Sequence, residues 1–377
     1  MSVKTVSGIA GASIKALLST SAASVKTWDG ESFSSVMPLS IITSAQTGTV
    51  VITSGLTTNT ASITAVDPDN SVVIFGGQSG ASANTVGNNF FSYLELDDAS
   101  TVRATRKGTT GILTVQYTVL EFTSDAMAAV VQKGIIDITS GTTGTDTITA
   151  VGSTAVVLYL GSCSTSTGTS GVHSCSVELT DSTTITATAG VSVSSNTLTV
   201  SYMVLELTTD IVQSVQQRTV TDTAAVTFYD DTITSVEPSR TILLPNGYQG
   251  TSMYQWAHAL ELTSSTNVRL TRNSASTTSR TVKYTVLQFQ LGVLKSAVQR
   301  GVIRENDNDA GEDITISAVV LAKSVCKHTG WTADSSTAFR ESVGRVLFTS
   351  TTNVRLYIGD PDENAHARGA YEVFEFN

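Results

Sequence analysis

The chain has 377 residues and a formal net charge of −10, and only 14% of its residues are charged. Because a nucleic-acid-binding surface needs a basic patch to replace counterions along the phosphates, this acidic balance excludes nucleic acid as an expected partner. No stretch approaches the roughly 20 consecutive apolar residues that span a bilayer, so we expect no membrane insertion. Many Ser, Thr and β-branched residues, with few Lys and Glu, favour strands and tight turns over helices.

The first 45 residues stand outside the pattern of the rest of the chain. They contain a short echo of their own, Ala12–Lys15 and Ala23–Lys26, followed by Thr27–Gly30. This segment is too short and too polar for a core, so we expect an extended arm that becomes ordered against another protein, with a disordered leader as the alternative. The residues expected to anchor the arm are Ile14, Lys15, Val25, Lys26 and Trp28.

Three markers then recur in fixed order. The closing marker is a strand that begins with Tyr, seen as Tyr117–Phe122, Tyr202–Leu207, Tyr284–Phe289 and Tyr371–Phe376. The opening marker is Val131–Gly134, Val215–Arg218 and Val298–Gly301, with a weaker Ala45–Gly48 before the first unit. The third lies between them, as Thr101–Arg103, Thr184–Thr186, Asn267–Arg269 and Asn353–Arg355. Repetition of this kind predicts an array of similar modules.

We therefore expect an N-terminal arm and four repeats, divided as 1–45, 46–130, 131–214, 215–297 and 298–377. In the first repeat, strand-like runs alternate with turn residues, at Thr49–Thr53, Thr60–Val66, Ser71–Gly76, Phe90–Leu96, Thr101–Arg106 and Ile112–Phe122. Six short strands in so small a unit predict an all-β chain of four tandem antiparallel β-sandwich modules, each of about 85 residues. The short intervals between repeats favour a semi-rigid string.

Two cross-strand pairs follow from the predicted hairpins. If the turn after Leu96 centres on Ala99, Glu95 faces Arg103, and Glu261 faces Arg269 in the third repeat. Opposite charges across a strand pair contribute only about 0.2–1 kcal/mol, and the second repeat has Thr186 at the Arg position. We therefore assign these residues a structural role.

The closing strand predicts a contact beyond its own repeat. Alternation along Tyr117–Phe122 makes both of its faces apolar near the end. A strand of this kind must be covered on both sides, so we expect it to meet the next module or a neighbouring chain.

The search for chemistry finds no catalytic, cofactor-binding or metal site to predict. The four histidines, His173, His258, His328 and His366, occupy non-equivalent positions and lack zinc spacing, so we expect incidental surface residues. Nucleotide-binding and acyl-transfer motifs are absent, and adjacent acids such as Asp97 and Asp98 are read as turn formers, so no enzyme is predicted.

Two features leave alternatives open. Cys163 and Cys175 could close a surface loop or stay reduced, as could be said of any thiol pair at this spacing, and Cys326 makes the count odd. The acidic run 305–313 either holds calcium or forms a solvated hairpin loop, and its Gly311 is misplaced for an EF-hand. Variable segments at equivalent places, namely 77–89, 162–174, 247–257 and 330–342, are where binding would be placed, although drift gives the same picture.

The repeats resemble those of tailed-bacteriophage structural proteins. The resemblance lies in the Val-Gln-Arg-Gly opening, the Asp67–Pro68 turn, the Thr101–Arg106 strand and the closing Tyr117–Phe122. The leader, with its Ala-Ser-Ile-Lys and Trp-Asp-Gly, resembles the arms of phage tail and fibre proteins. The resemblance implies a virion protein, a tail- or collar-associated fibre or appendage docked by its arm, whose partners are other virion proteins, copies of itself, with a trimer favoured, and host-surface glycans. A capsid decoration protein is the alternative.

Overall fold

The computed structural model describes residues 27–28, 31–32, 40–81, 86–168, 171–222, 227–251, 258–272, 280–305, 312–333, 344–358 and 367–377. Four of the five predicted anchor residues are not placed by it, since Ile14, Lys15, Val25 and Lys26 lie outside the described residues. Trp28 belongs to the short strand β1 (Thr27–Trp28), which pairs with β2 (Glu31–Ser32).

Each repeat contains six strands in the same order. The first has β3 (Ile42–Ile52), β4 (Thr58–Ser62), β5 (Ser71–Ala81), β6 (Ser92–Asp98), β7 (Thr101–Arg106) and β8 (Ile112–Phe122). The second has β9 (Gln132–Ile138), β10 (Gly141–Thr147), β11 (Ala155–Ser164), β12 (Cys175–Asp181), β13 (Thr184–Val193) and β14 (Leu198–Glu206). The all-β prediction is confirmed, and two of the six strands predicted in the first repeat match in both bounds.

The third and fourth repeats follow the same plan. The third has β15 (Val212–Asp222), β16 (Phe228–Thr232), β17 (Thr241–Gly250), β18 (Ala259–Ser264), β19 (Asn267–Thr271) and β20 (Arg280–Phe289). The fourth has β21 (Gln299–Glu305), β22 (Glu312–Thr315), β23 (Ser324–Ala333), β24 (Gly344–Ser350), β25 (Asn353–Ile358) and β26 (Ala367–Glu375). The helical turns among the described residues are short 3-10 segments, at Pro68–Asn70, Gly87–Asn89, Ser124–Ala126, Gly171–His173, Pro238–Arg240 and Leu321–Lys323.

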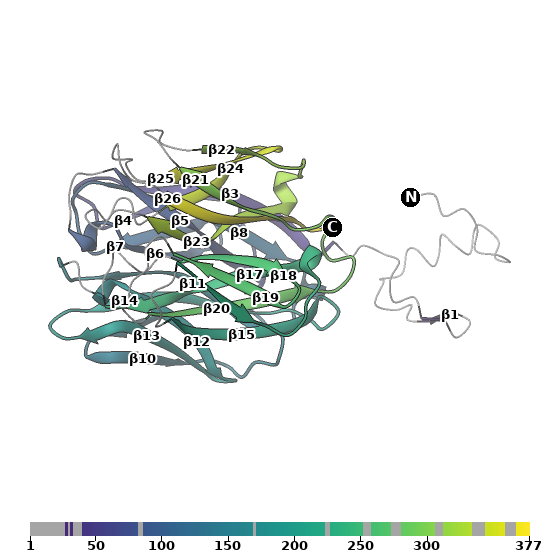
Figure 1. Ribbon diagram of the computed structural model, residues 1–377, viewed down its shortest axis with the longest axis horizontal. Coiled ribbons are helices and arrows are strands. Elements are labelled where there is room, and N and C mark those ends of the chain that lie inside the picture. Colours follow the sequence, from purple (N-terminus) through teal and green to yellow (C-terminus); the bar gives the residue numbers. More distant parts are fainter. Residues whose placement is uncertain are drawn as a thin grey trace.

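The sheets do not coincide with the repeats. Each six-stranded sheet joins the second, fifth and fourth strands of one repeat to the third, sixth and first strands of the next, as in the order β10-β13-β12-β17-β20-β15. The last sheet, β22-β25-β24-β5-β8-β3, joins the fourth repeat to the first, so the yellow end of the chain lies beside its purple beginning (Figure 1). The four sheets form a propeller-like ring. The expectation of a string is therefore wrong, because strand pairing closes the array on itself.

A single residue pair joins the two halves of each sheet. These pairs are Gly77 with Arg345, Gly161 with Tyr93, Gly247 with Ser176, and Gly330 with Ala259. All four glycines have positive φ, between 89° and 137°, and each follows or lies within a register shift of its strand. A Cβ atom on any of them would collide with the backbone carbonyl of the facing strand. Glycine is therefore required here for conformation and for close approach at once.

The repeated sequence markers meet one another inside each repeat. The glutamine of the opening marker makes two hydrogen bonds to the backbone of one residue just after the second strand. In the second repeat, Gln132 Nε2 donates to the carbonyl of Thr149 at 2.9 Å, and Gln132 Oε1 accepts from the N–H of Thr149 at 2.6 Å. Gln46, Gln216 and Gln299 make the same pair of bonds with Thr64, Thr234 and Ser317. Two residues on, Gly134 lies against the ring of Tyr202, which leaves no room for a side chain. The markers are thus folding elements.

The hydrophobic core has two levels. The second, third and fourth repeats each have a separate cluster of buried residues, and the cluster of the first repeat continues into a hub shared by all four. In the hub, Phe376 makes edge contacts with Phe122, Phe289 and Phe374 at ring-centroid distances of 5.6–6.1 Å. The second apolar face of the closing strand is thus covered within the same chain, by the closing strands of the other repeats.

We expect the junction glycines to be among the least replaceable residues of the ring. Gly247→Ala should lower the free energy of unfolding by about 3–5 kcal/mol, because it adds a left-handed backbone penalty and a collision with the carbonyl of Cys175. The matched control is Gly55→Ala, where φ is also positive, at 91°, but nothing lies within 4 Å. It should cost about 1–2 kcal/mol. Urea unfolding of both variants measures the difference, and equal losses would contradict the role of close approach.

Candidate functional site: the axial cavity and the charged junction

A cavity of about 140 Å³ lies where the third strands of the four repeats converge. Strands β5, β11, β17 and β23 each contribute one residue at the same position, two residues before the junction glycine, and these are Phe75, Tyr159, Pro245 and His328. All four are half-buried, whereas their neighbours along the strands are mostly buried. The axis of the ring is therefore surrounded by four different groups, one from each repeat: a phenyl ring, a phenol, a proline ring and an imidazole.

A second set of rings completes the lining. Phe91, Tyr248, His258 and Trp331 also border the cavity, together with the apolar Leu158 and Leu244. Among the described residues that line it, none is Asp or Glu. Phe75 and His328 contact each other edge to face, with ring centroids 6.0 Å apart. The lining is thus mainly apolar and aromatic, which is typical of small-ligand sites.

Three titratable rings of this region, those of His328, Tyr159 and Tyr248, are held neutral. Burial, with a smaller effect of the Lys327 charge, lowers the pKa of His328 to about 4. Burial likewise raises the pKa of Tyr159 and of Tyr248 well above the usual value for a phenol. At neutral pH the cavity therefore presents an uncharged imidazole and uncharged phenols.

Lys327, the one Lys or Arg among the described residues that line the cavity, is paired with a carboxylate. Lys327 and Glu372 are each 2% exposed, and Lys327 Nζ donates to Glu372 Oε2 at 2.9 Å. Lys327 also donates to the carbonyl of Leu243 in the preceding repeat, and Glu372 Oε2 accepts from the backbone N–H of Leu243 at 2.9 Å. Burial lowers the pKa of Lys327, and the Glu372 carboxylate opposes that shift. The pair thus satisfies both backbone groups of one residue on the inner edge of β17.

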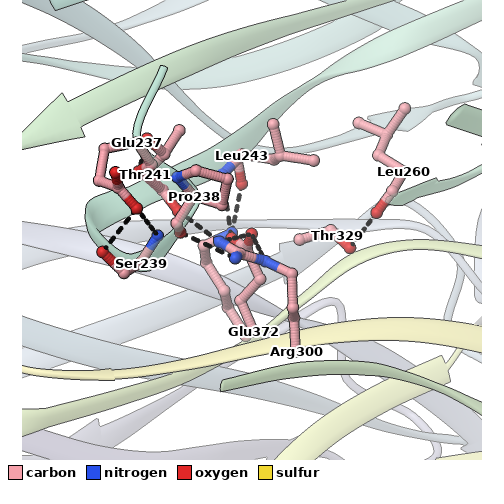
Figure 2. A network of polar contacts seen from close by, with 10 residues as sticks. Glu237, Pro238, Ser239, Thr241, Leu243, Leu260, Arg300, Thr329 and Glu372 are labelled. Carbon is pink, nitrogen blue, oxygen red and sulfur yellow. Dashed lines mark hydrogen bonds and ion pairs between the residues drawn. The ribbon is translucent and has the colours of Figure 1, made fainter. Parts of the chain in front are cut away.

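Arg300 extends this pair toward the neighbouring loop, as Figure 2 shows. Its guanidinium donates to Glu372 Oε1 at 3.2 and 3.3 Å and to the carbonyls of Pro238 and Thr241 at 2.9 and 2.5 Å. The loop itself is fixed by Glu237, whose side chain accepts from Ser239. Thr329 donates to the carbonyl of Leu260 at 2.7 Å, a further bond between the third and fourth repeats (Figure 2). This junction is therefore held by charge as well as by strand pairing.

The equivalent positions of the other repeats are uncharged. Ile74, Leu158 and Leu244 stand where the fourth repeat has Lys327, and Thr118, Met203 and Thr285 stand where it has Glu372. Met203 makes the corresponding bond in the second repeat, since its Sδ accepts from the N–H of Val73 in the first repeat at 3.3 Å. Equivalent backbone N–H groups, those of Val73 and Leu243, thus donate to a thioether at one junction and to a carboxylate at another.

The predicted cross-strand pairs have different partners in the two repeats. Glu95 lies opposite Arg103, whose Nε donates to it at 3.2 Å, and Arg103 also pairs with Asp97 at 2.8 Å. Glu261 lies opposite Arg269 in the ladder, but Arg269 pairs with Asp230 at 2.8 Å. Glu261 pairs instead with Arg368 of the fourth repeat, at 2.9 Å. In the third repeat the acid of the predicted pair therefore joins two repeats.

Three histidines differ from the expectation of surface residues. His173 and His258 are buried, and His328 borders the cavity. Their positions follow from the sheets turning inward at the junctions, where short loops pack between repeats, as His173 stacks on Phe91 with centroids 5.4 Å apart. His366 lies outside the described residues, as does most of the acidic run, 306–311. Cys163, Cys175 and Cys326 are free and buried.

The described beginnings of the four variable segments meet at the cavity. Each begins at or beside a junction glycine, namely Gly77, Gly161, Gly247 or Gly330. The described parts touch across repeats: Gly87 lies against His173, and Gly171 lies against the backbone of Gly250. Residues at or near the start of all four segments, namely Gln78, Ser162, Tyr248 and Trp331, thus line the cavity.

One buried residue with many hydrogen bonds, Arg106, was not predicted from the sequence. Arg106 is 1% exposed and donates to five backbone carbonyls around the loops of the first repeat, those of Thr53, Leu56, Asn89, Thr110 and Gly111, at 2.9–3.3 Å. Strand alternation could have found it, because Val102, Ala104 and Arg106 share the buried face of β7 while Arg103 lies on the other. Arg106 therefore holds the loops of the first repeat in place.

The comparisons with known proteins return no match. Neither a protein-family model nor a curated protein sequence matches this chain. Within the described part of the chain, no group of three or more His, Cys, Asp or Glu side chains is arranged to hold a metal ion. No helix in that part is long and apolar enough to cross a membrane. The candidate site is thus defined by the cavity and its surrounding segments.

We expect that removing one member of the buried ion pair lowers the free energy of unfolding strongly, whereas replacing both members with apolar residues changes it little. Glu372→Met alone should lower the free energy of unfolding by about 3–5 kcal/mol, because it leaves the Lys327 charge buried. Lys327→Leu together with Glu372→Met recreates the Leu158 and Met203 of the second repeat and should fall within about 1 kcal/mol of the original chain. Denaturant titration compares the three proteins. A double variant as unstable as the single one would contradict this account.

We also expect stability to fall between pH 6.5 and pH 4. Burial lowers the pKa of both His173 and His328 from 6.5 to about 4, so in this window the unfolded chain binds protons that the folded chain does not. By linkage each imidazole then removes up to about 3 kcal/mol as the pH drops. Chemical unfolding at pH 7, 5.5 and 4.5 should show the loss, and the double variant His173→Phe, His328→Phe should flatten it. An unchanged slope in that variant would refute the assignment.

Proposed function

We propose that this chain is a non-enzymatic structural protein of a tailed-phage virion, a ring-shaped head attached to the particle through its N-terminal segment. One observation carries most weight: the four sheets draw all their strands from Ile42 to Glu375, so the ring is complete without the first 40 residues. That segment is then available for docking on another virion protein. The resemblance of the repeats and of the leader to phage tail and fibre proteins supports the same proposal.

The use of the repeated residues also supports a structural role. Gln132 bridges the edge of its repeat, Gly134 and Tyr202 pack together, and the Val of the third marker is buried, as Val102 is. Features kept in four copies thus serve folding, whereas the described beginnings of the segments that vary line the cavity. A scaffold of constant strands that carries variable segments is suited to display and adhesion, and a host-surface glycan is a fitting target.

Further elements of the proposal concern modularity and assembly. We propose that each repeat forms a sandwich-like unit, on the support of the separate cores of the second, third and fourth repeats, such as that of Ile185 and Val200 in the second. Residues 46–130, 131–214, 215–297 and 298–377 stay the predicted units, and strand pairing crosses each boundary. On the particle we propose a homo-oligomer, with a trimer as the first state to test.

Removal of residues 1–39 tests the docking function. The truncated chain should keep its unfolding midpoint, because its sheets are intact, and should no longer be incorporated into particles. Incorporation is measured by mass spectrometry of purified virions and by symmetry-relaxed cryo-electron microscopy. A few copies at the tail or collar support an appendage, and hundreds of copies over the shell would instead favour capsid decoration. Full incorporation of the truncated chain would refute docking through this segment.

A further inference from the structure

We infer that the axial cavity binds one small neutral aromatic group, of phenol or indole size, whose O–H or N–H faces His328. The inference concerns the cavity between β5, β11, β17 and β23 and does not depend on where the protein resides. It rests on the size of the cavity, on the chemistry of its walls and on one polar group.

The size fits a single aromatic ring. The cavity has a volume of about 140 Å³. Apolar cavities of roughly 150 Å³ stay dry and take up benzene-sized molecules. The half-buried rings of the wall also expose apolar surface to this partly open cavity, and a ligand that covers this surface removes it from water, which is favourable. A single-ring molecule thus suits this space in volume.

The walls favour an aromatic ligand over other neutral ones. Rings from all four repeats border the cavity, including Phe75, Tyr159, Tyr248 and Trp331. Aromatic groups gain from edge and offset contacts with such rings beyond the area that they bury. The geometry already shows this arrangement in the contact of Phe75 with His328.

Charged ligands and sugars are disfavoured by the polar groups present. Lys327 is bonded to Glu372 and to Leu243, so a charged ligand would be buried without a counter-ion. Tyr159 and Ser162 bond to each other at 2.8 Å, and Gln78 Oε1 accepts from both the N–H and the hydroxyl of Ser92. A hexose would bring several hydroxyls into a space where Tyr159, Ser162 and Lys327 already have partners, which is costly.

His328 supplies the polar handle. Its ring is half-buried at the cavity wall, and neither ring nitrogen bonds to another residue within the described part of the chain. The imidazole is neutral at pH 7, so one nitrogen donates and the other accepts. A phenol hydroxyl can match either role, whereas toluene can match neither.

The test uses the full chain with phenol, 4-methylphenol, indole and toluene, with binding measured by calorimetry and ligand-observed NMR at pH 7. We expect phenol to bind at submillimolar to millimolar concentration and about tenfold more tightly than toluene, the difference that one hydrogen bond supplies. His328→Phe keeps the ring volume and should bring phenol and toluene to equal affinity. If no phenol binding is detected at roughly 10 mM, about tenfold above the expected range, the inference is overturned.

Two matched variants on β11 locate the site. Leu158→Trp fills the cavity from a residue that lines it and should abolish binding of every probe. Val157→Ile enlarges the adjacent residue on the opposite face, inside the core of the second repeat, and should leave binding unchanged. If Leu158→Trp does not fold, nuclear Overhauser contacts from 4-fluorophenol to the ring protons of Phe75 and His328 replace it. Binding that survives the filled cavity, or contacts elsewhere, would refute the site.

The same probes separate two sources of the aromatic group. N-acetyl-tyrosinamide carries the phenol ring on a peptide unit, and 4-methylphenol carries it alone. If only 4-methylphenol binds, the inference holds and the cavity is assigned to a free small molecule. If both probes bind, the inference holds and the ligand can also be a tyrosine side chain of a partner. Incorporation of the chain that lacks residues 1–39, the result that would refute docking, leaves these binding results untouched, so the two proposals fail separately.

Discussion

The backbone contact at four glycines is the constraint on which the rest of the ring depends. Each sheet is continuous only because a glycine such as Gly77 adopts a left-handed φ and lets its strand meet the carbonyl of the facing repeat. That single meeting point turns the third strand inward and leaves its remaining inner edge unpaired by backbone. The inner edges of four strands then face a common axis, and both the hub and the cavity follow from this geometry.

The unpaired inner edge explains the polar groups near the axis. A buried backbone N–H without an acceptor is costly, and the structure supplies one from the closing strand of the next repeat. Met203 serves Val73 in this way, and Glu372 serves Leu243. The carboxylate cannot remain buried alone, so Lys327 and Arg300 accompany it. A local hydrogen-bond requirement thus leads to the only fully buried Lys–Glu pair in the described part of the chain.

The sequence predicted local structure well and assembly poorly, for a physical reason. Period-two alternation fixed strands such as Thr101–Arg106, and the doubly apolar Tyr117–Phe122 predicted a second covering layer. Which layer covers it depends on a pairing between residues as distant as Gly77 and Arg345, and no local pattern encodes that. The cavity was missed for the same reason: Phe75, Tyr159, Pro245 and His328 share a position only once four repeats are superposed on a closed ring.

The departures from fourfold symmetry indicate where specificity resides. Identical repeats could pair in any cyclic order or with repeats of another chain, since the junction needs only a glycine and a strand. The fully buried pair of Lys327 and Glu372 occurs at one junction among the described residues, where a mismatched repeat would leave a buried charge without its partner. Such a pair adds little net stability but penalises wrong pairings. The asymmetry therefore favours the pairing of the third repeat with the fourth over the pairing of either with another repeat.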